Sequence, residues 1–183
     1  MIKISFLAAE LIYTCIWFMT RCFVWKHHKS IQWKREAVLI LMYLNLAVII
    51  RLVFFPRELL ESHIQPLIFD FATAFPFRIN IVPLVRLFDF NNTRDIIWNV
   101  IGNTAMFIPS GILLPIAYKK LDRFWKVVAT GALISLCIEL LQLPFPSRAS
   151  DIDDLLLNTL GVAVGYGIDA IVKQLKRSLR RRT

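Results

Sequence analysis

The sequence has few of the residues that hold metal ions or disulfides. Its three cysteines, Cys15, Cys22 and Cys137, stand singly inside apolar stretches, and its three histidines form no H-E-x-x-H pattern. A disulfide framework and a zinc site are therefore not expected, and the cysteines are predicted to be buried, inert thiols. No resident metal or cofactor is indicated.

Acidic residues are also scarce, because 13 Asp and Glu face 22 Lys and Arg for a net charge of +9. In a soluble chain this excess would suggest nucleic acid as the partner. Here the basic residues flank long apolar runs instead, and hydrophobic residues make up 57% of the 183-residue chain. This pattern is typical of an integral membrane protein, so membrane lipids rather than nucleic acid are the expected partner.

Five apolar runs are long enough to cross a bilayer, and they predict an all-α, polytopic helix bundle. The first run is too long for the apolar region of a signal peptide, and no small-x-small cleavage site closes it, so we interpret it as a retained helix. Pro109 predicts a kink in the third helix. The five predicted spans cover residues 4–25, 37–55, 96–118, 127–143 and 155–172.

The distribution of basic residues predicts the orientation. The connectors at 26–36 and 119–126 hold four Lys or Arg each and the tail at 173–183 holds six, whereas the opposite side, including Lys3 before the first span, holds six in all. The positive-inside rule then places the N-terminus outside and the C-terminus in the cytoplasm. The chain divides into a first helix with its basic connector (1–36), a four-helix membrane domain (37–172) and a basic cytoplasmic tail (173–183). Within the domain, the Phe-rich, Pro-interrupted segment 57–95 is predicted to lie along the outer interface or to dip partly into the bilayer.

Polar residues of the spans gather in the half of the membrane that this orientation makes the outer one. Spacings of three or four residues put several of them on common helix faces. Since intramembrane charges are costly and usually turn inward to partners or water, an outward-facing polar pocket is predicted. Its proposed members are Asn99, Asn103, Glu139, Gln142, Arg148, Asp151, Asp153, Asp154 and Asn158, with Arg51 and Asn80 in support.

Each of these residues also has a purely structural interpretation. The asparagines would bond between helices. A buried Glu139 would be protonated, and Asp151 or Ser150 would cap a helix. Arg51 would pair with Glu10. Below Asn158 the same stripe continues with two glycines, and Gly161-x-x-x-Gly165 predicts close packing of the fifth helix.

The ordered motifs resemble those of the VanZ-like family of bacterial membrane proteins, which is named for a protein of glycopeptide-resistance clusters. The similarity extends from about Arg51 to Val172 and omits the first helix. It rests on Asn80-Ile-Val-Pro83, Asn99-Val-Ile-Gly-Asn103, Phe107-Ile-Pro109-x-Gly111, Glu139-x-x-Gln142 and Asp151-Ile-Asp-Asp154-x-x-x-Asn158-x-x-Gly161. The resemblance implies a multi-pass protein of the bacterial cell membrane, with a link in some members to teicoplanin-type resistance.

Three kinds of function stay open at this point. The favoured hypothesis is a non-enzymatic envelope protein whose pocket binds a lipid head group, a cell-wall precursor or the antibiotic. The alternative is an intramembrane enzyme that acts on a lipid-linked cell-wall substrate, with Glu139 and one of Asp151, Asp153 or Asp154 as acid and base or as ligands of a divalent metal. A transporter is disfavoured because few polar residues lie in the inner half.

Overall fold

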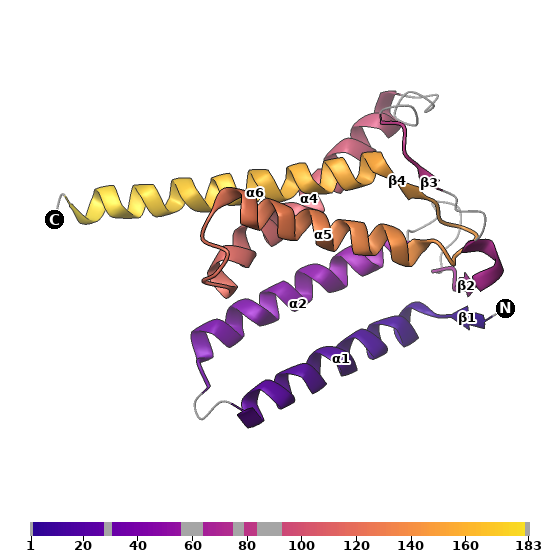
Figure 1. Cartoon of the computed structure of the whole chain (residues 1–183), viewed down its shortest axis with the longest axis horizontal. Coiled ribbons are helices and arrows are strands. Elements are labelled where there is room, and N and C mark those ends of the chain that lie inside the picture. Colours follow the sequence, from indigo (N-terminus) through magenta and orange to yellow (C-terminus); the bar gives the residue numbers. More distant parts are fainter. Residues whose placement is uncertain (1, 28–30, 56–63, 75–78, 84–92, 182–183) are drawn as a thin grey trace. The chain divides into compact units, whose positions relative to one another are not determined.

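The computed structural model describes residues 2–27, 31–55, 64–74, 79–83 and 93–181. Within these ranges the chain is almost entirely helical, and it has five helices that are long and apolar enough to cross a membrane. They are α1 (Phe6–His27), α2 (Trp33–Phe54), α4 (Thr93–Ala117), α5 (Phe124–Gln142) and α6 (Ile152–Arg180). The prediction of an all-α protein with five transmembrane helices is confirmed (Figure 1).

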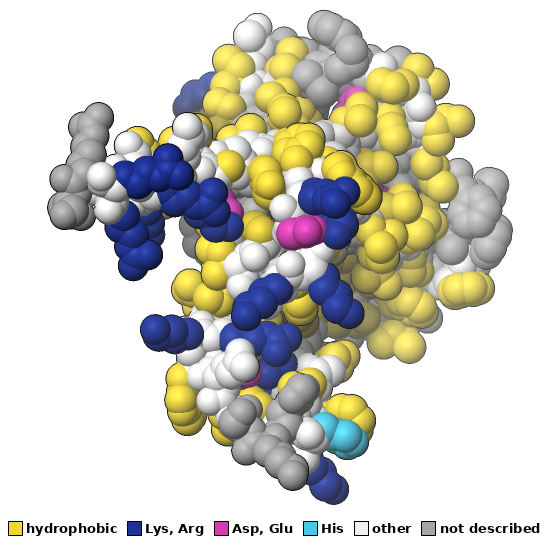
Figure 2. Space-filling view, turned by 60° about the vertical axis from the view of Figure 1, so that its left-hand side comes forward, with side chains coloured by type: hydrophobic (Ala, Val, Ile, Leu, Met, Phe, Trp, Pro, Cys, Tyr) yellow, Lys and Arg dark blue, Asp and Glu magenta, His cyan; other side chains and the backbone are white. Residues whose placement is uncertain are grey.

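Hydrophobic side chains cover much of the protein's surface, as expected where lipid is the solvent. Figure 2 shows them over one face, with Lys and Arg side chains gathered towards one part of it. Leu7, Phe18 and Leu141 are each more than half exposed. All three cysteines are exposed as well. The prediction of buried thiols is therefore wrong, because an apolar run contains lipid-facing and core-facing positions that look alike in sequence.

The chain forms two compact units. The first comprises residues 1–79 and 140–150, and the second comprises residues 80–139 and 151–183. α5 contributes its last residues to the first unit and the rest to the second.

The first unit contains the α1–α2 hairpin and a small sheet. β1 (Ile2–Ile4) pairs antiparallel with β2 (Leu67–Phe69), with Lys3 opposite Ile68, and a 3-10 turn, η1 (Phe71–Ala74), follows β2. Phe55, Leu67 and Phe145 form a buried cluster against which Phe6 and Phe69 pack. The sequence had assigned Ile4 to the first span, but the helix begins at Phe6 because the preceding residues join this sheet.

The second unit is built on α4, α5 and α6. α6 continues to Arg180, through most of the segment predicted as a separate basic tail. Residues 173–180 contain no helix breaker and are mostly Lys, Arg, Leu and Gln, which have high helix propensity, so nothing ends the helix at the end of the apolar run. α4 likewise continues through Pro109 and Pro115. Asn80 of β3 (Ile79–Asn80) and Asp151 of β4 (Ser150–Asp151) also belong to this unit, and β3 and β4 form a second, two-stranded sheet.

The Phe-rich segment is only partly described, by β2, η1 and β3. The predictions that fall on 56–63, 75–78 and 84–92 lie outside the described residues. Its placement along the membrane interface stays a prediction.

Candidate functional site

Close packing of α4 against α6 positions the polar residues of the second unit. Gly161 lies against the carbonyl oxygen of Thr104, and Gly165 lies against that of Ile108. From the α4 side, Gly111 lies against the carbonyl oxygen of Val162. At each of these positions a Cβ atom would collide with backbone of the other helix, so only glycine permits this approach. The predicted tight packing at Gly161-x-x-x-Gly165 is confirmed.

This approach brings Asn103 of α4 to Asp154 of α6. Asn103 Nδ2 donates to Asp154 Oδ1 at 2.6 Å, and it also lies 3.4 Å from Asn99 Oδ1, one turn earlier. Both bonds are partly buried. The predicted common face of Asn99 and Asn103 is confirmed, and that face is the one turned to the start of α6.

Asp151 organises the entry into α6. Its Oδ1 accepts from Asp153 N at 3.0 Å, which makes it the N-cap of the helix. The same oxygen accepts from Asn80 Nδ2 at 3.2 Å. The interpretation of Asp151 as a capping residue is therefore confirmed, and the cap also ties β3 to α6.

Glu139 approaches this turn from α5. Its Oε2 accepts from the backbone N–H of Asp151 at 2.9 Å, and its side chain is almost completely buried. Asp153 is equally buried. Burying carboxylates is expensive unless hydrogen bonds compensate for lost water, and the turn before α6 supplies such a bond to Glu139.

Asn158 lies one turn further along α6 and turns to α5. Its Nδ2 donates to Ser135 Oγ at 2.9 Å, and both side chains are buried. Asn158 Oδ1 and Thr104 Oγ1 are buried oxygens without a hydrogen-bond partner among the described residues. Neither Ser135 nor Thr104 was among the predicted site residues, although Thr104 directly follows Asn103 in the motif.

We call these residues of the second unit the carboxylate–amide cluster. It draws side chains from β3, α4, α5, β4 and the first turns of α6, and it combines acidic groups with amides. Its members are Asn80, Asn99, Asn103, Ser135, Glu139, Asp151, Asp153, Asp154 and Asn158. Among the described residues, no group of three or more His, Cys, Asp or Glu is arranged to hold a metal ion.

Three predicted site residues belong to the first unit. Arg148 Nη2 donates to the carbonyl oxygen of Phe54 at 3.1 Å. Gln142 is buried, and its Oε1 has no partner among the described residues. The Arg51 guanidinium lies over the Phe6 ring, with Cζ 5.3 Å from the centroid, and no ion pair joins it to Glu10. The Arg51–Glu10 bridge is therefore wrong, and a cation–π contact takes its place.

The fold and the cluster define a multi-pass membrane protein with buried carboxylates and amides at one end of a closely packed helix pair. The chain belongs to the VanZ/LLP1 family, whose model matches residues 11–173. This match includes most of the first helix, which the resemblance by motifs had left out.

Protein VanZ of Enterococcus faecium is a relative with 34% identity over 93 residues. The aligned part covers 49% of this chain and 53% of that protein, so the chain spans about half the length of the curated relative it matches. No solved structure matches the chain.

Proposed function

We propose that this protein is a VanZ-like component of the bacterial cell envelope that contributes to glycopeptide resistance by binding at the carboxylate–amide cluster. The observation that carries the proposal is the contact of Asn103 with Asp154 beside the buried Glu139–Asp151 turn. Ionisable groups within membrane segments are expensive and mark functional sites by default. Family membership supports the link to resistance.

The chemistry of the cluster indicates what it binds. Carboxylates accept hydrogen bonds and attract cations, while amides both donate and accept. A ligand rich in hydroxyl, amide or amine groups complements such a set. Cell-wall precursors, glycosylated lipid head groups and glycopeptide antibiotics of the teicoplanin type all carry groups of this kind. We therefore infer a binding role in which the ligand is held at the membrane surface.

This role requires the cluster to face the cell exterior. With five crossings, the basic connectors at 26–36 and 119–126 and the end of α6 share one side, and the positive-inside rule makes that side cytoplasmic. A reporter that works in the cytoplasm, such as a fluorescent protein, is expected to be active when it is fused after Thr183. A periplasmic or extracellular reporter at the same place is expected to be inactive. The reverse pattern would put the cluster inside and contradict the proposal.

The resistance test compares Glu139→Gln with the wild type. Glutamine keeps the shape of the side chain and one acceptor oxygen for Asp151 N, so the turn stays intact while the negative charge is lost. In a susceptible host, expression of the wild-type gene is expected to raise the inhibitory concentration of teicoplanin several-fold. Glu139→Gln is expected to return it to the level of the empty vector.

Asp122→Asn supplies the matched control. Asp122 lies on the connector between α4 and α5, where the hydrogen bond from Lys126 Nζ (2.6 Å) holds the pKa of its carboxyl below the usual range. It is exposed and outside the cluster, so its loss is expected to leave resistance unchanged. Equal resistance from the wild type and Glu139→Gln, at equal amounts of membrane-inserted protein, would refute a role for the cluster.

A second candidate, an intramembrane enzyme, is favoured by the proximity of two buried acidic residues, Glu139 and Asp151. Carboxyl groups in a shielded site serve acid–base chemistry, and here the Glu139 carboxylate meets the backbone N–H of Asp151. Incubation of the purified protein with a lipid-linked cell-wall precursor separates the two functions. A binding protein leaves the mass of the precursor unchanged, whereas an enzyme produces a new mass that disappears with Glu139→Gln.

A further inference from the structure

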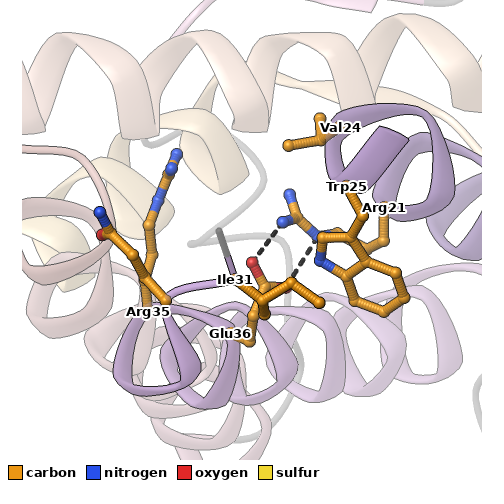
Figure 3. Close-up of a pocket in the computed structure, with 7 residues that line it drawn as sticks. Arg21, Val24, Trp25, Ile31, Arg35 and Glu36 are labelled. Atoms are coloured by element: carbon orange, nitrogen blue, oxygen red, sulfur yellow. Dashed lines mark hydrogen bonds and ion pairs between the residues drawn. The ribbon is translucent and has the colours of Figure 1, made fainter. Parts of the chain in front are cut away.

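A second polar site lies in the first unit, at the ends of α1 and α2 that meet through the connector. It is a cavity of about 100 Å³ lined mainly by Arg21 and Trp25 of α1 and by Gln32, Arg35 and Glu36 at the start of α2. Figure 3 shows the Arg21–Glu36 pair within it, with Trp25 from one helix and Arg35 from the other. We call this the hairpin pocket. It has room for more than a single water molecule.

Within the hairpin pocket, the charge of Glu36 is compensated. Arg21 Nε donates to Glu36 Oε2 at 3.0 Å, and Arg21 Nη2 pairs with Glu36 Oε1 in a two-pronged ion pair. Both side chains are about nine-tenths buried. The pair therefore contributes no net charge to the cavity that it helps to line.

Two other polar groups of the pocket, the Arg35 guanidinium and the Trp25 indole N–H, are donors. Arg35 is exposed, and its guanidinium forms no ion pair or hydrogen bond with a described residue. Trp25 Nε1 is buried and has no hydrogen-bond partner in the described chain, although the Trp25 ring lies beside Arg21, whose Cζ is 5.9 Å from its centroid. A buried indole N–H without a partner is rare and calls for an acceptor. One uncompensated guanidinium and one unpaired N–H together select an anion.

The location specifies the source of the anion. The pocket lies where two membrane helices end, beside the exposed Lys26 and Lys34 and the 76%-exposed Trp33. Tryptophan and lysine side chains at this depth are typical of the head-group region. Basic pockets between transmembrane helices bind anionic head groups. The N-terminus of α2 also adds a positive dipole end at the cavity.

We propose that the hairpin pocket binds the phosphate group of an anionic phospholipid, held by Arg35 and by Trp25 Nε1. The site is distinct from the carboxylate–amide cluster, and it does not depend on the proposed role in resistance. The lipid would fasten α1 to α2 at their connector.

Native mass spectrometry of the full-length protein, titrated with phosphatidylglycerol or phosphatidylcholine, tests the proposal. The wild type is expected to bind phosphatidylglycerol in preference. Arg35→Gln is expected to lower the affinity for the first bound phosphatidylglycerol molecule by about five-fold, because one basic residue near a lipid surface contributes about that much. Trp25→Phe keeps the ring beside Arg21 and leaves the charge unchanged, but it is expected to weaken binding by about ten-fold, because one hydrogen bond to a charged group is lost.

Trp33→Phe is the matched control, since it alters an exposed tryptophan of the same connector outside the pocket, and it is expected to bind like the wild type. Equal affinities of Trp25→Phe and Trp33→Phe would overturn the proposal and leave only general attraction to the surface. Equal binding of both lipids would overturn it too. Displacement of phosphatidylglycerol by millimolar inorganic phosphate would show that the site binds soluble phosphate, and it would refute a phospholipid as the ligand.

Discussion

Gly161→Ala is expected to lower the free energy of unfolding by about 2 kcal/mol, because it forces α4 and α6 apart. The new Cβ would collide with the Thr104 carbonyl oxygen and lie 3.0 Å from Phe107 Cβ. The backbone atom cannot move without shifting the helix. Overpacking of a tight interface costs about 1–3 kcal/mol, and a collision with backbone belongs to the upper end of this range. The better helix propensity of alanine offsets about 1 kcal/mol of this cost. The midpoint of unfolding in mixed micelles on addition of SDS, followed by circular dichroism, measures the change.

Gly167→Ala gives the matched comparison. Gly167 lies on the same helix, but a Cβ there would meet no atom within 4 Å. Only the better helix propensity of alanine remains, so this variant is expected to be as stable as the wild type or slightly more stable. Equal losses from both substitutions would show that α4 and α6 do not cross at Gly161.

The same substitution is expected to disturb the carboxylate–amide cluster. Asn103 directly precedes Thr104, the residue that Gly161 contacts. Asn103 also donates a hydrogen bond to Asp154, close to this contact between α4 and α6. A shift of α4 would lengthen the 2.6 Å contact of Asn103 with Asp154. Loss of resistance in Gly161→Ala, with Gly167→Ala unaffected, would then link the helix packing to the function.

The helices of this protein could be predicted from the sequence because lipid requires long apolar runs with internally satisfied backbones. The β1–β2 pair could not. Ile2–Ile4 continues the apolar run of α1, and its partner Leu67–Phe69 lies more than 60 residues away along the chain. A three-residue strand carries no periodicity of its own, so only tertiary pairing distinguishes it from the start of a helix.

For the candidate site, spacing predicted which polar residues share a helix face, but not which residues they contact. Spacing placed Asn99 with Asn103 and Asp151 with Asp154, and the structure brings Asn103 of α4 to Asp154 at the start of α6. The depth of the α6 residues in the membrane differs from the prediction, because α6 begins at Ile152 rather than at Leu155. Three residues at about 1.5 Å each put Asn158 nearly one turn deeper, where it meets Ser135. Which face of α5 turns to α6 depends on packing that periodicity cannot supply.

Nothing in the sequence pattern paired Arg21 with Glu36, although this contact is expected to be the largest single polar contribution to the α1–α2 hairpin. The two residues stand 15 positions apart, on opposite sides of the connector, and each looks like an isolated charge near the end of a span. Their two-pronged pairing appears only when the hairpin closes. A guanidinium and a carboxylate buried together are stable as a pair and costly when separated.

Glu36→Gln is therefore expected to destabilise the hairpin by about 3–5 kcal/mol, the cost of leaving one member of a buried ion pair without its partner. Arg21→Met is expected to cost less. A lone carboxyl can take up a proton and become neutral, whereas a lone guanidinium cannot lose one. Hydrogen exchange of the α1 amides, together with the unfolding midpoint on addition of SDS, measures both effects.

The double variant Arg21→Met/Glu36→Leu separates the pair's own contribution from the penalty of breaking it. Replacing a buried ion pair by apolar residues of similar volume is often neutral or stabilising, so the double variant is expected to recover most of the stability that Glu36→Gln loses. In lipid this recovery should be strong, because the alternative is an unpaired charge among apolar side chains. A double variant as unstable as Glu36→Gln would show that the geometry of the pair itself, and not the avoidance of a lone charge, holds α1 to α2.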